Sequence, residues 1–176
     1  YRMNAQSRAL EDSFRNWRIP YKLIGSVRFY ERKEIKDVIA YLRLAANPHE
    51  SVSLRRVINT PTRGIGATSI SRLDEFAAGR GTSVWDALLH IEDARDIPAR
   101  SRHAMAAFAE IIKHLGVMSS QARVTRLTQE ALVVSGYAEA LESEDTMEAR
   151  TRLENVRELL TVTERFDTEA EDSSLS

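Results

Sequence analysis

The sequence predicts a mainly α-helical protein with a helix-hairpin-helix in its interior and a short strand–helix–strand piece at its start. Only seven of the 176 residues are glycine and four are proline, which is few for a turn-rich β fold. From residue 31 onward, apolar residues recur at the i, i+3 and i+4 spacing of amphipathic helices. With 43% apolar and 29% charged residues, the chain has enough material for a hydrophobic core.

The first 24 residues differ from the rest. Residues 1–4 are expected to end a strand, residues 5–17 to form a helix with Leu10, Phe14 and Trp17 on one face, and residues 19–24 to be extended. Such a piece is typical of the corner of an α/β domain whose other strands lie elsewhere. Because the chain begins at Tyr1, within the first of these strands, we expect it to be part of a longer protein.

Local signals delimit the later helices. Asn47-Pro48 ends the first of them, Thr82-Ser83 supplies an N-cap, and Ser135-Gly136 interrupts a longer helical stretch. We expect helices over residues 31–46, 84–91, 99–118, 124–134, 137–141 and 146–166. The acidic, serine-rich residues 167–176 are expected to be a linker.

The most informative segment is residues 51–73, which we interpret as two short helices joined by a glycine hairpin. Leu54, Val57 and Ile58 mark the buried face of the first helix, and Ile70 and Leu73 mark that of the second. The segment Thr-Pro-Thr-Arg-Gly-Ile-Gly between them has a proline that ends the first helix and two glycines that permit a tight turn.

This hairpin would expose backbone N–H groups at the start of the second helix, where an anion such as phosphate binds readily. Arg55, Arg56, Arg63 and Arg72 lie in or beside it, and no acidic residue occurs from residue 51 to residue 73. The pattern favours a helix-hairpin-helix that holds a nucleic-acid backbone without reading its sequence. A plain corner between two helices is the alternative interpretation.

The net charge of −1 conceals a strong asymmetry. Residues 1–126 carry 21 Lys and Arg against 13 Asp and Glu, whereas residues 127–176 carry 4 against 13. The basic part suits nucleic-acid binding, and the acidic part could fold back to cover it. Two solvated faces of opposite sign would explain the same numbers.

Several kinds of active site are excluded or disfavoured. The segment Gly-Arg-Gly-Thr-Ser at residues 79–83 lacks the length and the lysine of a phosphate-cradling P-loop. The chain contains no cysteine, and its four histidines have no partner at i+3 or i+4, which makes a zinc site improbable. No serine lies on a strand-to-helix elbow. We therefore expect no catalytic residue and no metal ligand in this chain.

The aromatic residues allow two interpretations. Phe29 and Tyr30, flanked by basic residues, could stack on the bases of a single strand. The favoured interpretation is that they close the core where one domain passes into the next. Trp17 and Trp85 fall on apolar helix faces and are expected in the core.

Four segments together resemble the superfamily 1 DNA helicases of the UvrD/PcrA/Rep type. They are YRMNAQSRALEDSF, IPYKLIGSVRFYERKEIKDVIAYLRLAANP, LRRVINTPTRGIG and TRLENVRELL, in that order. The resemblance covers nearly the whole chain and implies that residues 1–30 begin the RecA-like 2A domain and that residues 31–166 form most of the helical 2B subdomain. One departure is Gly25-Ser26, where the family usually has Gly-Gly.

The resemblance also implies roles for individual residues. Arg2, Asn4 and Arg28 match positions that contact single-stranded DNA. Thr60, Arg63, Gly64, Ile65 and Gly66 match the hairpin that holds the duplex backbone, and we add Arg55 and Arg56 from their charge and position.

The function that the resemblance implies is the DNA-binding part of an ATP-dependent 3′→5′ helicase acting in repair or replication. ATP and Mg²⁺ would be bound by other parts of the full-length protein and not by this segment. The expected partners are DNA with a junction between single strand and duplex, and repair or replication proteins. No membrane partner is expected. The expected location is the bacterial cytoplasm, in association with the nucleoid. A stand-alone helix-hairpin-helix module and a regulatory protein-interaction domain are the alternatives.

Overall fold

The computed structural model describes residues 29–170, and this part of the chain is mainly α-helical, as predicted. Its elements, in chain order, are η1 (Phe29–Glu31), α2 (Lys33–Ala46), α3 (Ser51–Val57), α4 (Ala67–Arg80), α5 (Val84–Leu89), η2 (Ile91–Asp93), α6 (Ala99–Ser119), α7 (Val124–Val134), α8 (Tyr137–Ser143) and α9 (Met147–Glu169). The predicted strand–helix–strand piece lies outside the described residues.

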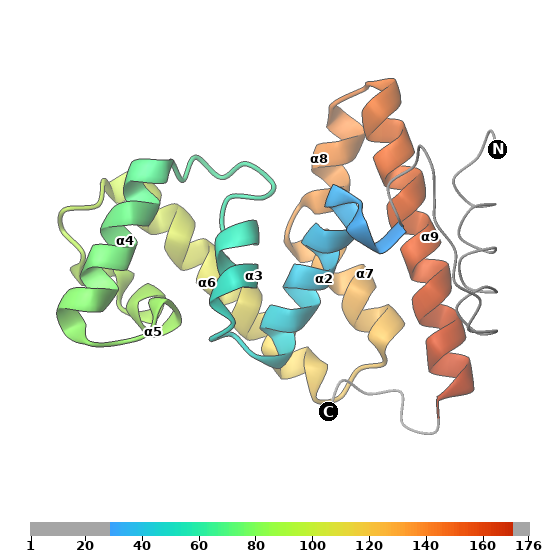
Figure 1. Ribbon diagram of the computed structural model, residues 1–176, viewed down its shortest axis with the longest axis horizontal. Coiled ribbons are helices and arrows are strands. Elements are labelled where there is room, and N and C mark those ends of the chain that lie inside the picture. Colours follow the sequence, from blue (N-terminus) through green and yellow to red (C-terminus); the bar gives the residue numbers. More distant parts are fainter. Residues whose placement is uncertain (1–28, 171–176) are drawn as a thin grey trace.

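Helix α2 is the centre of the arrangement (Figure 1). It packs against α3 and α6 on one side and against α7 and α9 on the other. Both sides of the helix are buried: Ile35 and Val38 face one hydrophobic cluster, and Tyr41 and Leu44 face another. The helix ends at Asn47, in an extended conformation, before Pro48.

Two hydrophobic clusters lie on the two sides of α2. The larger is built from α3 to α6 with parts of α2 and α7, and its members include Leu54, Ile65 and Phe108. The smaller joins η1 and α2 to α7, α8 and α9, and its members include Phe29 and Leu159. Phe29 has no exposed surface and meets Tyr30 edge-on at 5.1 Å between ring centroids, which confirms the core interpretation for this phenylalanine.

Side-chain caps fix the starts of several helices. Ser83 Oγ accepts the N–H of Asp86, and Thr146 Oγ1 accepts the N–H of Ala149, as is common at N-caps. Helix α7 is capped from elsewhere in the chain. The carboxylate of Asp167 in α9 accepts the N–H groups of Val124 and Thr125 at 3.1 and 2.9 Å.

Several predicted helix ends differ from the structure: α2 begins at Lys33 rather than at residue 31, and α8 runs to Ser143 rather than to residue 141. The expected helix over residues 84–91 stops at Leu89, where His90 leaves the helical conformation, and a 3₁₀ turn follows. The last helix runs past residue 166 to Glu169, because Asp167 is buried against α7 as its cap. The predicted acidic linker 167–176 therefore begins inside α9, and its residues 171–176 lie outside the described part. Trp85 is buried as expected, at 6% exposure, whereas Trp17 is not described.

Within residues 29–170, no helix combines the length and apolarity needed to span a membrane.

Candidate nucleic-acid interface

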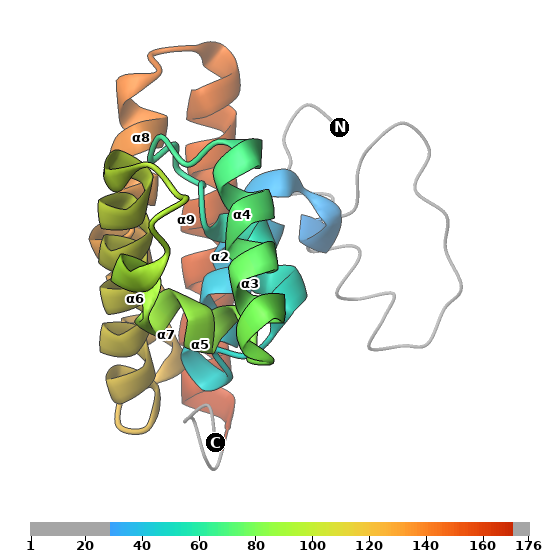
Figure 2. The ribbon, with the colours of Figure 1, turned by 90° about the vertical axis from the view of Figure 1, so that its left-hand side faces the viewer.

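The predicted hairpin is a loop of nine residues, 58–66, between α3 and α4. Figures 1 and 2 both show it at the end of the molecule where α8 lies, opposite the connection between α6 and α7. The peptide bond between Thr60 and Pro61 is cis, and Gly64 has a φ of 76° in the left-handed region. Ile65 is only 1% exposed, so its side chain anchors the loop in the larger cluster.

The flanking helices do not pack mainly on each other. Helix α3 packs against α2 and α4 packs against α5. An ion pair of 2.5 Å from Arg55 to Asp74 links the two helices at the surface. The loop is therefore held by its own residues and by the core beneath it rather than by a close pair of helices.

Asn59 organises the inner side of the loop. Its Oδ1 accepts the backbone N–H groups of Arg63 at 2.8 Å and of Ile65 at 3.1 Å. One asparagine thus replaces the backbone partners that these two groups would have in regular structure. The neighbouring N–H groups are left to face outward.

These outward groups are the chemical feature of the site. In the described part of the chain, the backbone N–H groups of Gly64, Gly66, Ala67 and Thr68 make no hydrogen bond. All four residues are exposed, and Gly66 is the N-cap of the 14-residue helix α4. Unpaired N–H groups and the positive end of the helix dipole favour an anion at this place.

Arg100 adds a cation that the sequence did not reveal. Its guanidinium lies beside Gly64, so that a Cβ built on this glycine would be 3.7 Å from Arg100 Nε. Arg100 is exposed, and no hydrogen bond or ion pair engages it within residues 29–170. It belongs to the first turn of α6, where a positive charge opposes the helix dipole. That unfavourable placement was the signal that could have singled it out.

The three arginines expected to contact phosphate are engaged within the fold. Arg55 pairs with Asp74 at 2.5 Å, and Arg56 Nε pairs with Asp37 Oδ1 at 2.8 Å. Asp37 is 2% exposed, so Arg56 neutralises a buried carboxylate. The guanidinium of Arg63 points inward and donates to Tyr41 Oη at 2.7 Å. The absence of acidic residues along residues 51–73 did not exclude carboxylates brought in from α2 and from the next turn of α4.

Thr60 and Tyr41 complete the inner face. Thr60 Oγ1 donates to the carbonyl of Arg56 at 3.2 Å, and Tyr41 Oη donates to the carbonyl of Thr60 at 2.5 Å. Burial is the main reason that the pKa of Tyr41 is raised above its ordinary value, and the nearby Arg63 acts in the opposite direction. The tyrosine therefore stays protonated at neutral pH and keeps its donor to the loop.

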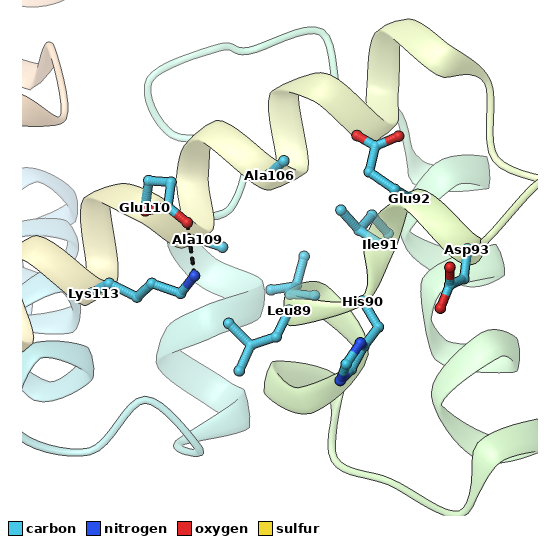
Figure 3. A pocket seen from close by; sticks show the side chains of 10 residues that line it. Leu89, His90, Ile91, Glu92, Asp93, Ala106, Ala109, Glu110 and Lys113 are labelled. Atoms are coloured by element: carbon cyan, nitrogen blue, oxygen red, sulfur yellow. Dashed lines mark hydrogen bonds and ion pairs between the residues drawn. The ribbon is translucent and has the colours of Figure 1, made fainter.

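Two hollows lie in the described part of the chain, and one of them borders the loop. One is lined by residues of α2, the loop, α8 and α9, among them Lys33, Asn59, Thr62, Tyr137 and Arg152. The other, shown in Figure 3, lies between the α5–η2 segment and α6. Its floor is apolar, and its charged side chains are spread around the edge, with the Glu110–Lys113 pair at one end and Asp93 at the other.

No group of three or more His, Cys, Asp or Glu residues in positions 29–170 is arranged to hold a metal ion. The glycine-containing segment 79–83 is the connection between α4 and α5, where Gly81 has a φ of 64° and Ser83 caps α5. Its residues serve local structure and do not form a phosphate cradle.

The predicted single-strand contacts Arg2, Asn4 and Arg28 lie outside the described residues, and their roles remain predictions.

Comparison with known proteins places the chain. Residues 1–176 match the family described as UvrD-like helicase C-terminal domain. The chain belongs to this family. Three similar proteins are each named ATP-dependent DNA helicase PcrA. The protein of Bacillus subtilis (strain 168) is 40% identical over 175 residues, which is 99% of this chain and 24% of the relative. That of Leuconostoc citreum is 41% identical over 167 residues, 95% of this chain and 22% of the relative. That of Staphylococcus aureus (strain Mu50 / ATCC 700699) is 38% identical over 177 residues, with 99% and 24% covered.

This UvrD-like domain spans about a quarter of the length of the curated relatives it matches. The family confirms the resemblance of the four sequence segments, and the helical content agrees with it.

Proposed function

We propose that this chain is the duplex-binding part of an ATP-dependent DNA helicase, and that loop 58–66 holds a phosphate of the DNA backbone. One observation carries the proposal: the guanidinium of Arg100, which has no partner in the described residues, lies beside Gly64 in a segment with four unpaired backbone N–H groups. These groups belong to Gly64, Gly66, Ala67 and Thr68. Such a site offers both the dipoles and the charge that phosphate requires. The family and the names of the relatives support a helicase role.

The residues have different roles in this proposal. Gly64, Gly66 and Arg100 contact the phosphate, the glycines through their backbone. Thr60, Ile65 and Arg63 shape the loop from inside, whereas Arg55 and Arg56 are each paired to a carboxylate and hold the flanking helices in place. Arg2, Asn4 and Arg28 would contact single-stranded DNA.

The mechanism follows from what phosphate contacts do. They position a protein on the duplex without reading its sequence. The loop would therefore grip any duplex ahead of a junction while other parts of the longer protein bind ATP and Mg²⁺ and move along one strand in the 3′→5′ direction. In this proposal the chain contributes positioning on the duplex, and ATP hydrolysis belongs to the other parts of the longer protein.

The test is fluorescence anisotropy of the chain with a duplex carrying a 3′ single-stranded tail, over a salt series. Arg100→Ala should weaken binding and lower the slope of log K against log salt by about 0.9, the value for one phosphate contact. Arg123→Ala is the matched control, because this exposed arginine lies at the start of α7, at the opposite end of the molecule. Equal slopes for Arg100→Ala and the native chain would refute the contact. A strong dependence of affinity on base sequence would refute the mechanism.

A further inference from the structure

We infer that Arg63 positions the duplex-binding loop by hydrogen bonding to the α7–α8 corner, residues 135–136. Its side chain does not itself contact phosphate. This inference rests on the function proposed above for the same loop. It gives the arginine of the Thr-Arg-Gly-Ile-Gly segment a role different from the one its charge suggested.

The guanidinium of Arg63 is the centre of the loop's inner face. Nη1 donates to the carbonyls of Val57, Ile58 and Pro61 at 3.1, 3.4 and 3.2 Å. These carbonyls belong to the end of α3 and to the first half of the loop. The side chain thus closes the loop back on its own start.

The other nitrogen of the same guanidinium reaches out of the loop. Nη2 donates to Tyr41 Oη at 2.7 Å and to the carbonyl of Ser135 at 3.1 Å. The guanidinium carbon also lies 5.5 Å from the centre of the Phe108 ring, within the range of a cation–π contact. Three different helices therefore meet at one side chain.

This arrangement engages both terminal nitrogens of the guanidinium within the fold. Turning Arg63 toward solvent would leave Tyr41 Oη without its donor and would free a set of partly buried carbonyls. The planar fork of an arginine suits several acceptors at once, whereas the ammonium of a lysine could serve only some of them. We call this arrangement, in which Arg63 bonds to the start of the loop, to Tyr41 and to Ser135, the Arg63 clasp.

The corner to which the clasp reaches is itself well fixed. Ser135 is the C-cap of α7, and Gly136, with a φ of 72°, begins α8. Tyr137 Oη donates at 2.9 Å to Asp37, the carboxylate that pairs with Arg56 at the end of α3. The loop is thus joined to this corner from both of its flanks: by Arg63 through Ser135, and by Arg56 through Asp37 and Tyr137. A displacement of this corner would displace the N–H groups that face the DNA.

The replacement of Arg63 by lysine distinguishes a positioning role of this side chain from direct contact with phosphate. A lysine keeps the charge that a phosphate contact needs, but it cannot keep the fork. Arg63→Lys should weaken duplex binding roughly tenfold, as for one lost charge-assisted hydrogen bond, and should leave the salt slope unchanged. Arg100→Lys, its matched control, should bind within about threefold of the native chain, because a lysine retains the phosphate charge.

Tyr41→Phe provides a second, independent arm. Tyr41 is 1% exposed, so its side chain does not reach DNA, and phenylalanine keeps its volume. This variant should also weaken binding. The double variant with Arg63→Lys should bind no more weakly than Arg63→Lys alone, because both changes open the same clasp. Hydrogen exchange of residues 58–66 should be faster in each variant than in the native chain, whose overall fold is checked by circular dichroism.

Two results would overturn the inference alone: native-like binding by Arg63→Lys, or effects of the two substitutions that add independently. In either case, an altered salt slope for Arg100→Ala would leave the proposed function standing. Absence of duplex binding by the folded native chain would overturn both.

Discussion

Gly64 and Gly66 provide a matched test of how the loop is built, because only one of them needs to be glycine for backbone reasons. Gly64 has a φ of 76°, whereas Gly66 has a φ of −78° and a ψ of 164°, which any residue adopts. The prediction is that Gly64→Ala destabilises the fold and that Gly66→Ala does not.

The magnitude for Gly64→Ala follows from two opposing terms. An L-residue in the left-handed region costs about 1–2 kcal/mol. Replacing glycine also lowers the entropy of the unfolded chain, which recovers about 0.4–1 kcal/mol. The new Cβ would meet Arg100 Nε at 3.7 Å, an ordinary contact that adds no clash. The net loss should be about 1 kcal/mol, or a fall in Tm of roughly 2–4 °C for a chain of this size.

For Gly66→Ala the two terms nearly cancel. The same entropic gain applies, and nothing lies within 4 Å of the new Cβ. Alanine is a poorer N-cap than glycine by a few tenths to about 1 kcal/mol. The change in stability should stay within about 0.5 kcal/mol.

The assay is urea unfolding followed by circular dichroism at 222 nm, with calorimetry for Tm. The expected order of stability is Gly66→Ala equal to the native chain, and Gly64→Ala below both. Equal losses in the two variants, or no loss in Gly64→Ala, would refute the assignment of a required left-handed residue at position 64.

Three further predictions concern the polar groups around the loop and the caps. Arg56→Ala should lower the free energy of unfolding by about 2–3 kcal/mol, somewhat less than for a fully buried pair because the Arg56 side chain is 34% exposed. Arg55→Ala, at an exposed ion pair, should lower it by under about 1 kcal/mol. Equal urea midpoints for the two variants would contradict this. Asp167→Ala should cost about 1–2 kcal/mol through the lost cap of α7, with the exposed Glu164→Ala as control, and equal midpoints for the two would count against the cap. Burial raises the pKa of Tyr137 above the ordinary value of about 10, so its contribution is complete below pH 10 and is lost as the pH rises further; the free energy of unfolding of the native chain should fall more steeply above pH 10 than that of Tyr137→Phe, and parallel curves would argue against it.

Local patterns in the sequence located the helices but not all of their ends. Periodicity located α7 at residues 124–134, and Ser83 and Thr146 act as the N-caps that their residue types indicate. Hydrogen bonds between near neighbours determine these features, so a short window of sequence contains the relevant information. The end of α9 was missed because Asp167 is held by α7, about 40 residues earlier in the chain.

The candidate site shows the same division between local and long-range effects. The glycines and the start of α4 were predictable, since a turn and a helix N-terminus are local. The partners of Arg55 and Arg56 were not, because charge counting along residues 51–73 could not include Asp37 and Asp74. The inward direction of Arg63 and the approach of Arg100 to Gly64 also depend on how distant helices pack.

The central claim, that loop N–H groups hold a DNA phosphate, is tested most directly by NMR. In a ¹⁵N–¹H titration of the chain with a short duplex, the largest shifts should occur at the amides of Gly64, Gly66, Ala67 and Thr68. Those of Arg63 and Ile65, already bonded to Asn59, should move less. Large shifts confined to other surfaces, with these four amides unmoved, would contradict the account.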